Sequence, residues 1–146
     1  IAKTMDSTSY PNLENCLMSS LPFKTSIDLY VFVQGETWMD EGSLRVISDA
    51  SEMVVRGFEF MDLSQVWGIE NGKIRNAKSG KYLAETDCEI SSSSSDETTF
   101  EIVKVSGYEV YIKSPCGFVT TNETSRITFS GSSSSWYMIP VAKAMA

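Results

Sequence analysis

The feature of this sequence that most limits its fold is an internal repeat with a spacing of 36 residues. When the sequence is displaced by 36 positions, residues 74–105 lie over residues 110–141 without a gap. The two segments match in chemical class at seven apolar positions, although few residues are identical. The coincident pairs are Ile74 with Val110, Tyr82 with Phe118, Leu83 with Val119, Phe100 with Trp136, Ile102 with Met138, Val103 with Ile139, and Val105 with Val141. This match predicts that one supersecondary unit recurs within a single fold.

A third, less regular copy precedes these two. Its first strand would be the apolar run at residues 29–33, and Trp38 takes the place of Tyr82. Trp67 closes this copy, but 29 positions separate it from Trp38, whereas 18 positions separate Tyr82 from Phe100. We therefore expect an insertion in the first copy.

The copies consist of short apolar runs rich in Val, Ile, Phe, Tyr and Trp, which are interrupted by Gly, Ser, Asn and Asp. This pattern is typical of strands, and no stretch in the copies predicts a long amphipathic helix. Three copies of about four short strands each would build a β-trefoil, in which a closed barrel has no open sheet edge. We predict an all-β fold, a β-trefoil of three pseudo-repeats at about 27–69, 70–105 and 106–141. The trefoil domain would span residues 27–146, after an N-terminal extension at residues 1–26.

The junction of the first two copies has a more specific pattern. Residues 64–83 read SQVWGIENGKIRNAKSGKYL, with a Gln-x-Trp (QxW) motif, a turn, an Ile-x-Asn strand and a Ser-Gly-Lys-Tyr-Leu segment. This stretch resembles the joint between repeats in the ricin-B-type β-trefoil lectins, and the resemblance covers about residues 27–141. The other two copies have Thr98 and Ser134 where the QxW glutamine would stand.

The resemblance implies a sugar pocket in any repeat that combines three features. These are an Asp directly after the apolar pair, an aromatic ring, and a polar pair, usually Asn-Gln, before the tryptophan. A carboxylate and an amide satisfy neighbouring sugar hydroxyls, while an aromatic ring covers the apolar face of the sugar. In the first repeat the resemblance places Asp40 at the carboxylate position and Gln65 at the amide position, and Ser64 replaces the usual Asn. Phe58 or Phe60 would supply the ring.

The other two repeats lack the acid. Ala84 and Thr120 follow the apolar pair there, and Glu85 comes one residue late. The resemblance therefore implies at most one sugar site, in the first repeat. Two structural alternatives stay open, because Asp40 could serve a β-turn and Gln65 could hydrogen-bond the backbone at the joint.

Charge and composition exclude several classes of function. The chain has 12 Lys and Arg against 19 Asp and Glu, a net charge of -7, and no basic cluster, so we expect neither nucleic-acid nor anionic-membrane binding. No apolar run approaches the ~20 residues that a membrane span needs. The absence of histidine removes the Ser-His and Cys-His nucleophile pairs and the commonest zinc ligand. We predict no enzyme, no cofactor and no metal.

The cysteines and one sequon bear on the compartment. Cys16, Cys88 and Cys116 form no CxxC motif, so one disulfide with one free thiol and three buried thiols both stay open. Cys88 and Cys116 are the candidate pair, since they fall in the second-to-third repeat region. Asn122 begins an Asn-Glu-Thr sequon in a predicted turn and would be glycosylated if a eukaryote secretes the protein. The chain begins with Ile, which is compatible with a removed leader, and we expect a secreted or extracellular protein.

Two functions fit these observations. The first is a non-catalytic, lectin-like module that binds a carbohydrate or a glycoprotein. The second is a protein-interaction trefoil, such as a secreted protease inhibitor or effector, without sugar binding. Its working surface would be the insertion (about residues 43–61) or the N-terminal extension, since a trefoil supplies only a rigid barrel from which loops project.

Overall fold

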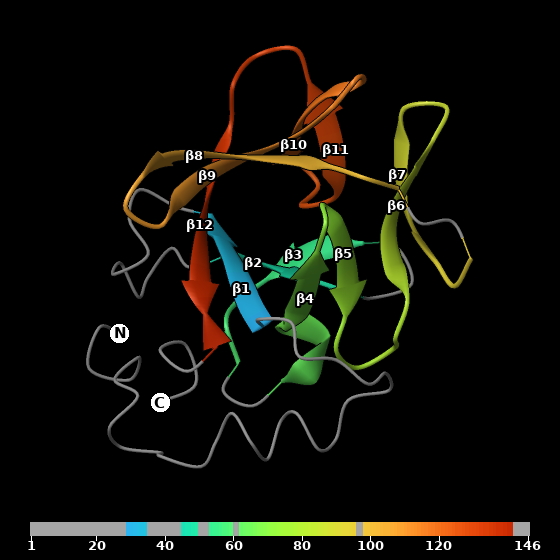
Figure 1. Cartoon of the computed structure of the whole chain (residues 1–146), viewed down its shortest axis with the longest axis vertical. Helices are drawn as coiled ribbons and strands as arrows, with labels where there is room; N and C mark the ends of the chain where they lie inside the picture. The colour runs from blue at the N-terminus through green and yellow to red at the C-terminus, as the bar shows by residue number, and fades with distance from the viewer. Residues whose placement is uncertain (1–28, 35–44, 50–52, 60–61, 96–97, 142–146) are drawn as a thin grey trace.

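A computed structural model of the chain describes residues 29–34, 45–49, 53–59, 62–95 and 98–141 (Figure 1). The predicted N-terminal extension lies outside this part of the chain. The described residues form twelve antiparallel strands and a short 3-10 helix, η2, which confirms the all-β prediction for this part. The strands are β1 (Leu29–Gln34), β2 (Arg45–Ser48), β3 (Val54–Arg56), β4 (Trp67–Glu70), β5 (Lys73–Asn76), β6 (Tyr82–Thr86), β7 (Glu89–Ser93), β8 (Glu101–Ser106), β9 (Glu109–Ser114), β10 (Gly117–Thr121), β11 (Ile127–Ser130) and β12 (Ser135–Pro140), and η2 spans Leu63–Gln65.

The strands fall into three consecutive groups of four that share two of their internal pairings. In each group the first strand pairs with the second, and the second and third form a hairpin: β2–β3, β6–β7 and β10–β11. The groups are joined by the pairs β4–β5, β8–β9 and β12–β1. The first strand of the described chain therefore lies beside the last one (Figure 1).

The register relates the three groups to one another. The residue two positions after each closing aromatic (Trp67, Phe100, Trp136) lies opposite an apolar residue in the first strand of a neighbouring group. The three pairs are Ile69 with Ile74, Ile102 with Ile112, and Met138 with Phe32. The structure thus aligns Ile74 with Ile112, and the gapless alignment of Ile74 with Val110 is wrong by two positions. The reason is the turn after the strand, because Arg75 pairs with Tyr82 seven positions on and Lys113 with Phe118 five positions on.

A central core contains buried side chains from all three groups of strands. The three closing aromatics are at most 2% exposed and lie in this core. The indole N–H of Trp67 donates to the carbonyl of Ile47 (3.1 Å), and that of Trp136 donates to the carbonyl of Val119 (2.9 Å). Each tryptophan thereby satisfies its single donor, which burial requires.

β1 is buried on both faces. Phe32 contributes to the central core, whereas Val31 and Val33 belong to a second cluster with Val66 and Ala77 on the other side. This explains why residues 29–33 are a continuous apolar run, since a strand covered on only one face would alternate. Within the described part of the chain, no helix has the length and apolarity that crossing a membrane requires.

Candidate functional site

The predicted first-repeat site is only partly covered by the structure, since Asp40 and Phe60 lie outside the described residues. Gln65 is fully buried, and its amide is engaged inside the protein. Its Nε2 donates to the carbonyl of Gly57 (2.9 Å) and to the Ser48 hydroxyl (3.3 Å), and its Oε1 accepts from the amide of Glu59 (2.9 Å). These contacts are the backbone-bonding role that the sequence left open, and they use both N–H donors of the Gln65 side chain.

The contacts of Gln65 bear directly on Phe58. They hold the backbone at Gly57 and at Glu59, on both sides of this residue. The Phe58 ring is half-buried and packs against the second core cluster. Gln65 therefore positions the candidate ring and does not face a ligand itself.

Ser64 is also turned inward. It is 8% exposed, and its hydroxyl donates to the Asp62 carboxylate (2.6 Å). The same carboxylate caps η2 by accepting from the Ser64 amide (3.0 Å). Because Ser64 and Gln65 are both buried and bonded within the protein, the polar pair before Trp67 stabilises the joint between the repeats.

The equivalent positions in the other repeats do lie together. In the second repeat, the Thr98 hydroxyl accepts from the amide of Glu85 (2.8 Å), the residue after Ala84. In the third repeat, the hydroxyls of Thr120 and Ser134 are 2.7 Å apart. In the third repeat, the position after the apolar pair thus contacts the position two before the closing aromatic, and in the second repeat the contact is made one residue later.

Two further residues join this contact in the third repeat. The Gln34 amide donates to the Ser134 hydroxyl (3.1 Å) and accepts from the Thr121 hydroxyl (2.8 Å). We call Gln34, Thr120, Thr121 and Ser134 the third-repeat polar cluster, and all four side chains are half-buried. Such a set of hydroxyls and an amide offers donors and acceptors that match the hydroxyl groups of a sugar.

Sequence reasoning missed Gln34 and Thr121 as members of this cluster. The two residues are 87 positions apart, on β1 and β10, and they meet only because the fold brings these two groups of strands together. The only local signal was the polar residue that ends the apolar run of β1.

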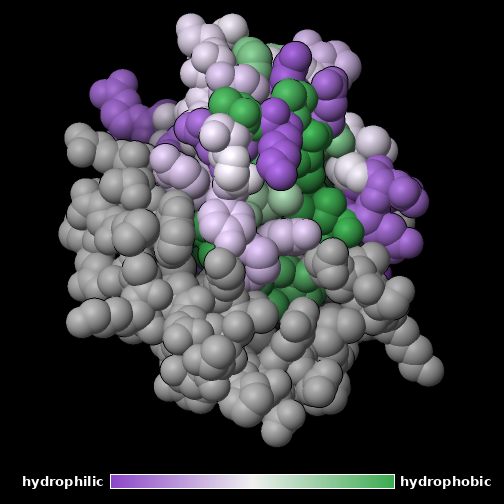
Figure 2. All heavy atoms as spheres, turned by 60° about the vertical axis from the view of Figure 1, so that its left-hand side comes forward, coloured by the Kyte–Doolittle hydropathy of each residue, from purple (hydrophilic) through white to green (hydrophobic). Residues whose placement is uncertain are grey.

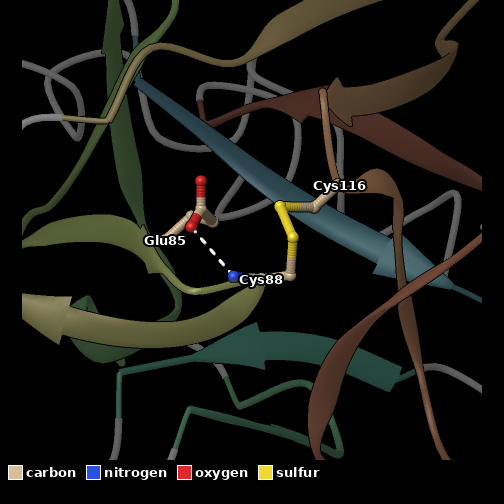
Figure 3. A group of neighbouring side chains, drawn as sticks. All are labelled: Glu85, Cys88 and Cys116. Carbon is tan, nitrogen blue, oxygen red and sulfur yellow. Dashed lines mark hydrogen bonds between the residues drawn. A yellow bond between two sulfur atoms is a disulfide. The ribbon is translucent and has the colours of Figure 1, made fainter.

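A disulfide joins the second and third groups. Cys88, in the turn between β6 and β7, is bonded to Cys116, in the turn between β9 and β10, as Figure 3 shows. The Glu85 carboxylate points toward this turn and accepts a hydrogen bond from the amide of Cys88 (3.0 Å). Asp87 and Cys88 both have positive φ angles (52° and 60°), so the turn has a left-handed backbone that suits a two-residue hairpin loop.

Glu85, Cys88 and Cys116 are also the described residues whose carboxylate and sulfur atoms lie close enough to hold a metal ion, within 4.8 Å of one another. Metal ligation by cysteine requires thiolates. The disulfide uses both sulfur atoms, so in this state the group acts as a covalent link between two hairpins.

Asn122 lies on the surface in the turn between β10 and β11. Its side-chain oxygen accepts from the amide of Thr124 (2.9 Å), the hydroxyl of Thr124 (2.7 Å) and the amide of Arg126 (3.1 Å). None of these three bonds uses the Nδ2 atom to which a glycan would be attached.

Comparison with known proteins assigns the chain to no family. No protein-family model matches the sequence, and no curated protein matches it.

Proposed function

We propose that the chain folds as a β-trefoil and acts as a non-catalytic module that binds carbohydrate outside the cell. The trefoil is supported by five strand pairs that connect six strands in series: β4–β5, β1–β4, β12–β1, β9–β12 and β8–β9. The remaining gap lies between β5 and β8. It is bridged by a hydrogen bond from the amide of Phe100 to the carbonyl of Gly72 (2.8 Å).

A glycine allows the two chains to come close to each other at this gap. Gly72 has φ +78°, and a Cβ atom there would lie 2.4 Å from the carbonyl oxygen of Phe100. Only glycine allows this approach of the two chains without a shift of the backbone. The close approach supports closure of the strands into a barrel.

Carbohydrate binding is supported chiefly by the contact between Thr120 and Ser134. It joins, in the third repeat, the two positions that hold the acid and the amide in the lectins that the sequence resembles. By the repeat relation, Asp40 would stand at the matching end of the first repeat. There Gln65 fixes the backbone around Phe58, so Asp40 would supply the hydrogen-bond acceptor and Phe58 the stacking ring.

A glycan-array screen of the purified chain tests this proposal. Asp40→Ala should abolish binding, whereas Glu41→Ala, which removes the same charge from the neighbouring position, should retain it. A third variant, Thr120→Ala, separates the two regions, since a site in the first repeat does not depend on it. Loss of binding only with Thr120→Ala would move the site to the third-repeat polar cluster.

A protein-interaction trefoil is the second candidate. It is favoured by the inward orientation of Gln65 and Ser64, because the amide part of the lectin polar pair is then not exposed to a sugar. A blank glycan array together with inhibition in a panel of purified proteases would support this second function and contradict the first.

The extracellular location is supported by the disulfide, since such bonds persist in oxidising compartments. The solvent-exposed sequon at Asn122 is compatible with the same location.

A further inference from the structure

A groove opens beside β8 and β9, away from the residues of the candidate carbohydrate sites. Its volume is about 370 Å³, at the small end of the range of small-molecule sites, roughly 300–1,000 Å³. Figure 2 shows a face of the molecule on which hydrophobic atoms lie between hydrophilic ones in its coloured part. The lining residues are Tyr30, Ile102, Lys104, Gly107, Tyr108, Val110, Met138 and Pro140.

The floor of the groove is apolar and held in place. Ile102 and Met138 pack against the central core, to which Val110 belongs. The backbone amide of Met138 donates to the carbonyl of Tyr108 (2.8 Å), which ties the turn between β8 and β9 to β12. Because packed strands and a hydrogen bond fix these walls, the groove exists before any ligand arrives.

Lys104 places a positive charge at the mouth of the groove. Alternation along β8 puts Lys104 on the same face as Ile102, and these two residues lie opposite Val110 and Ile112 of β9. A β-bulge directly after Lys104 turns Val105 toward solvent, where it is 43% exposed. Lys104 itself is exposed and forms no ion pair with any residue that the structure describes.

We propose that this groove binds a small organic anion with an apolar body, such as an alkyl or aryl carboxylate. The apolar body would cover Ile102, Val110 and Met138, and the carboxylate would meet the ammonium group of Lys104. A neutral sugar would instead place hydroxyl groups against the apolar floor, where they have no partners. The groove shares no residue with either candidate carbohydrate region, so the two proposals stand or fall separately.

The net charge of -7 makes the local position of Lys104 important. The negative charges of the whole chain repel an anion at long range, but at physiological salt this repulsion is screened beyond about 8 Å. Lys104 is the only charged residue among the described residues that line the groove, so its ammonium group favours anionic ligands there. The expected selectivity is therefore for an anionic amphiphile over a neutral one of equal length.

The test is a titration of the isotope-labelled chain with octanoate and, separately, with octanol, followed by backbone amide NMR. Octanoate should shift the amide signals of Gly107, Tyr108 and Met138 in a saturable manner. Lys104→Met keeps the apolar stem of the side chain and removes its charge. It should weaken octanoate binding about fivefold and leave octanol binding unchanged.

Lys113→Met is the matched control, because Lys113 lies on β9 over the Phe118 ring and does not line the groove. It should leave octanoate binding as in the parent chain. Equal affinity for octanoate in the parent chain and in Lys104→Met would overturn the proposal. So would the absence of saturable shifts at the groove, or groove shifts that follow protein concentration without ligand, which would identify a second copy of the chain as the occupant.

Discussion

Gln65 shows how one side chain can organise a whole connection. Its amide is buried and bridges three segments, through the carbonyl of Gly57, the amide of Glu59 and the hydroxyl of Ser48. A buried amide with its bonds intact stabilises the fold, whereas partners left unsatisfied in the interior are costly. The QxW glutamine of this chain therefore has a structural role, which is to hold three segments together.

The substitution Gln65→Ala should lower the free energy of unfolding by about 2–4 kcal/mol. It leaves the carbonyl of Gly57 and the amide of Glu59 without their hydrogen-bond partners. Urea denaturation followed by tryptophan fluorescence measures the change. Gln34→Ala is the comparison, since Gln34 is half-buried at the surface and water can replace its partners. Equal losses for the two variants would mean that the Gln65 bonds are not special to the joint.

At the level of single residues, the burial of large apolar side chains can be predicted from the sequence, because it depends on their hydrophobicity. Trp67, Phe100 and Trp136, the large aromatic residues that close the three copies, are buried in the core. Which partner a polar side chain takes could not be predicted, because Gln34 and Thr121 meet only after distant strands have paired. The contacts between polar side chains in a binding site can therefore be known only from the structure, whereas the burial of large apolar residues can be predicted from the sequence.

Among the elements, the turns account for the differences between the copies. Arg75 lies over the Tyr82 ring (5.0 Å) and Lys113 lies over the Phe118 ring (5.1 Å), so the same cation–aromatic arrangement recurs on two hairpins. It recurs although the intervening turns differ by two residues. Displacement of the sequence could not detect this, since a gapless comparison cannot place a turn of different length.

The Cys88–Cys116 bond ties two of these hairpin regions across a sequence separation of 28 residues. Replacement of both cysteines by serine should lower the free energy of unfolding by about 3 kcal/mol, because the unfolded chain regains the entropy of an open loop. Urea denaturation of the oxidised parent and the double variant gives the value.

Cys16→Ser serves as the control. A peptide mass map of this variant under non-reducing conditions should still contain the disulfide-linked peptides of Cys88 and Cys116. A free thiol on Cys88 in the parent chain would contradict both the bond and the stability expected from it.

At the level of the whole molecule, β1 joins the first group of strands to the third and also pairs twice within its own group. It pairs with β12, β2 and β4, and its two faces contribute to both core clusters. The apolar run at residues 29–33 predicted a strand. That this strand would be central followed only from the pairing of the first and last described segments, which no local pattern encodes.

The pairing of Tyr30 with Pro140 means that the beginning of β1 and the end of β12 are neighbours. The order of the chain is then not essential to the shape. A circular permutant would join residue 141 to residue 29 by a short flexible linker and begin at Ser132, in the exposed turn between β11 and β12. It should fold with the same amide NMR pattern for the strands, whereas a permutant opened after Val31, inside β1, should not. The polypeptide could thus be cut and rejoined like a ring, with its ends moved to whichever side an attached label or fused domain requires.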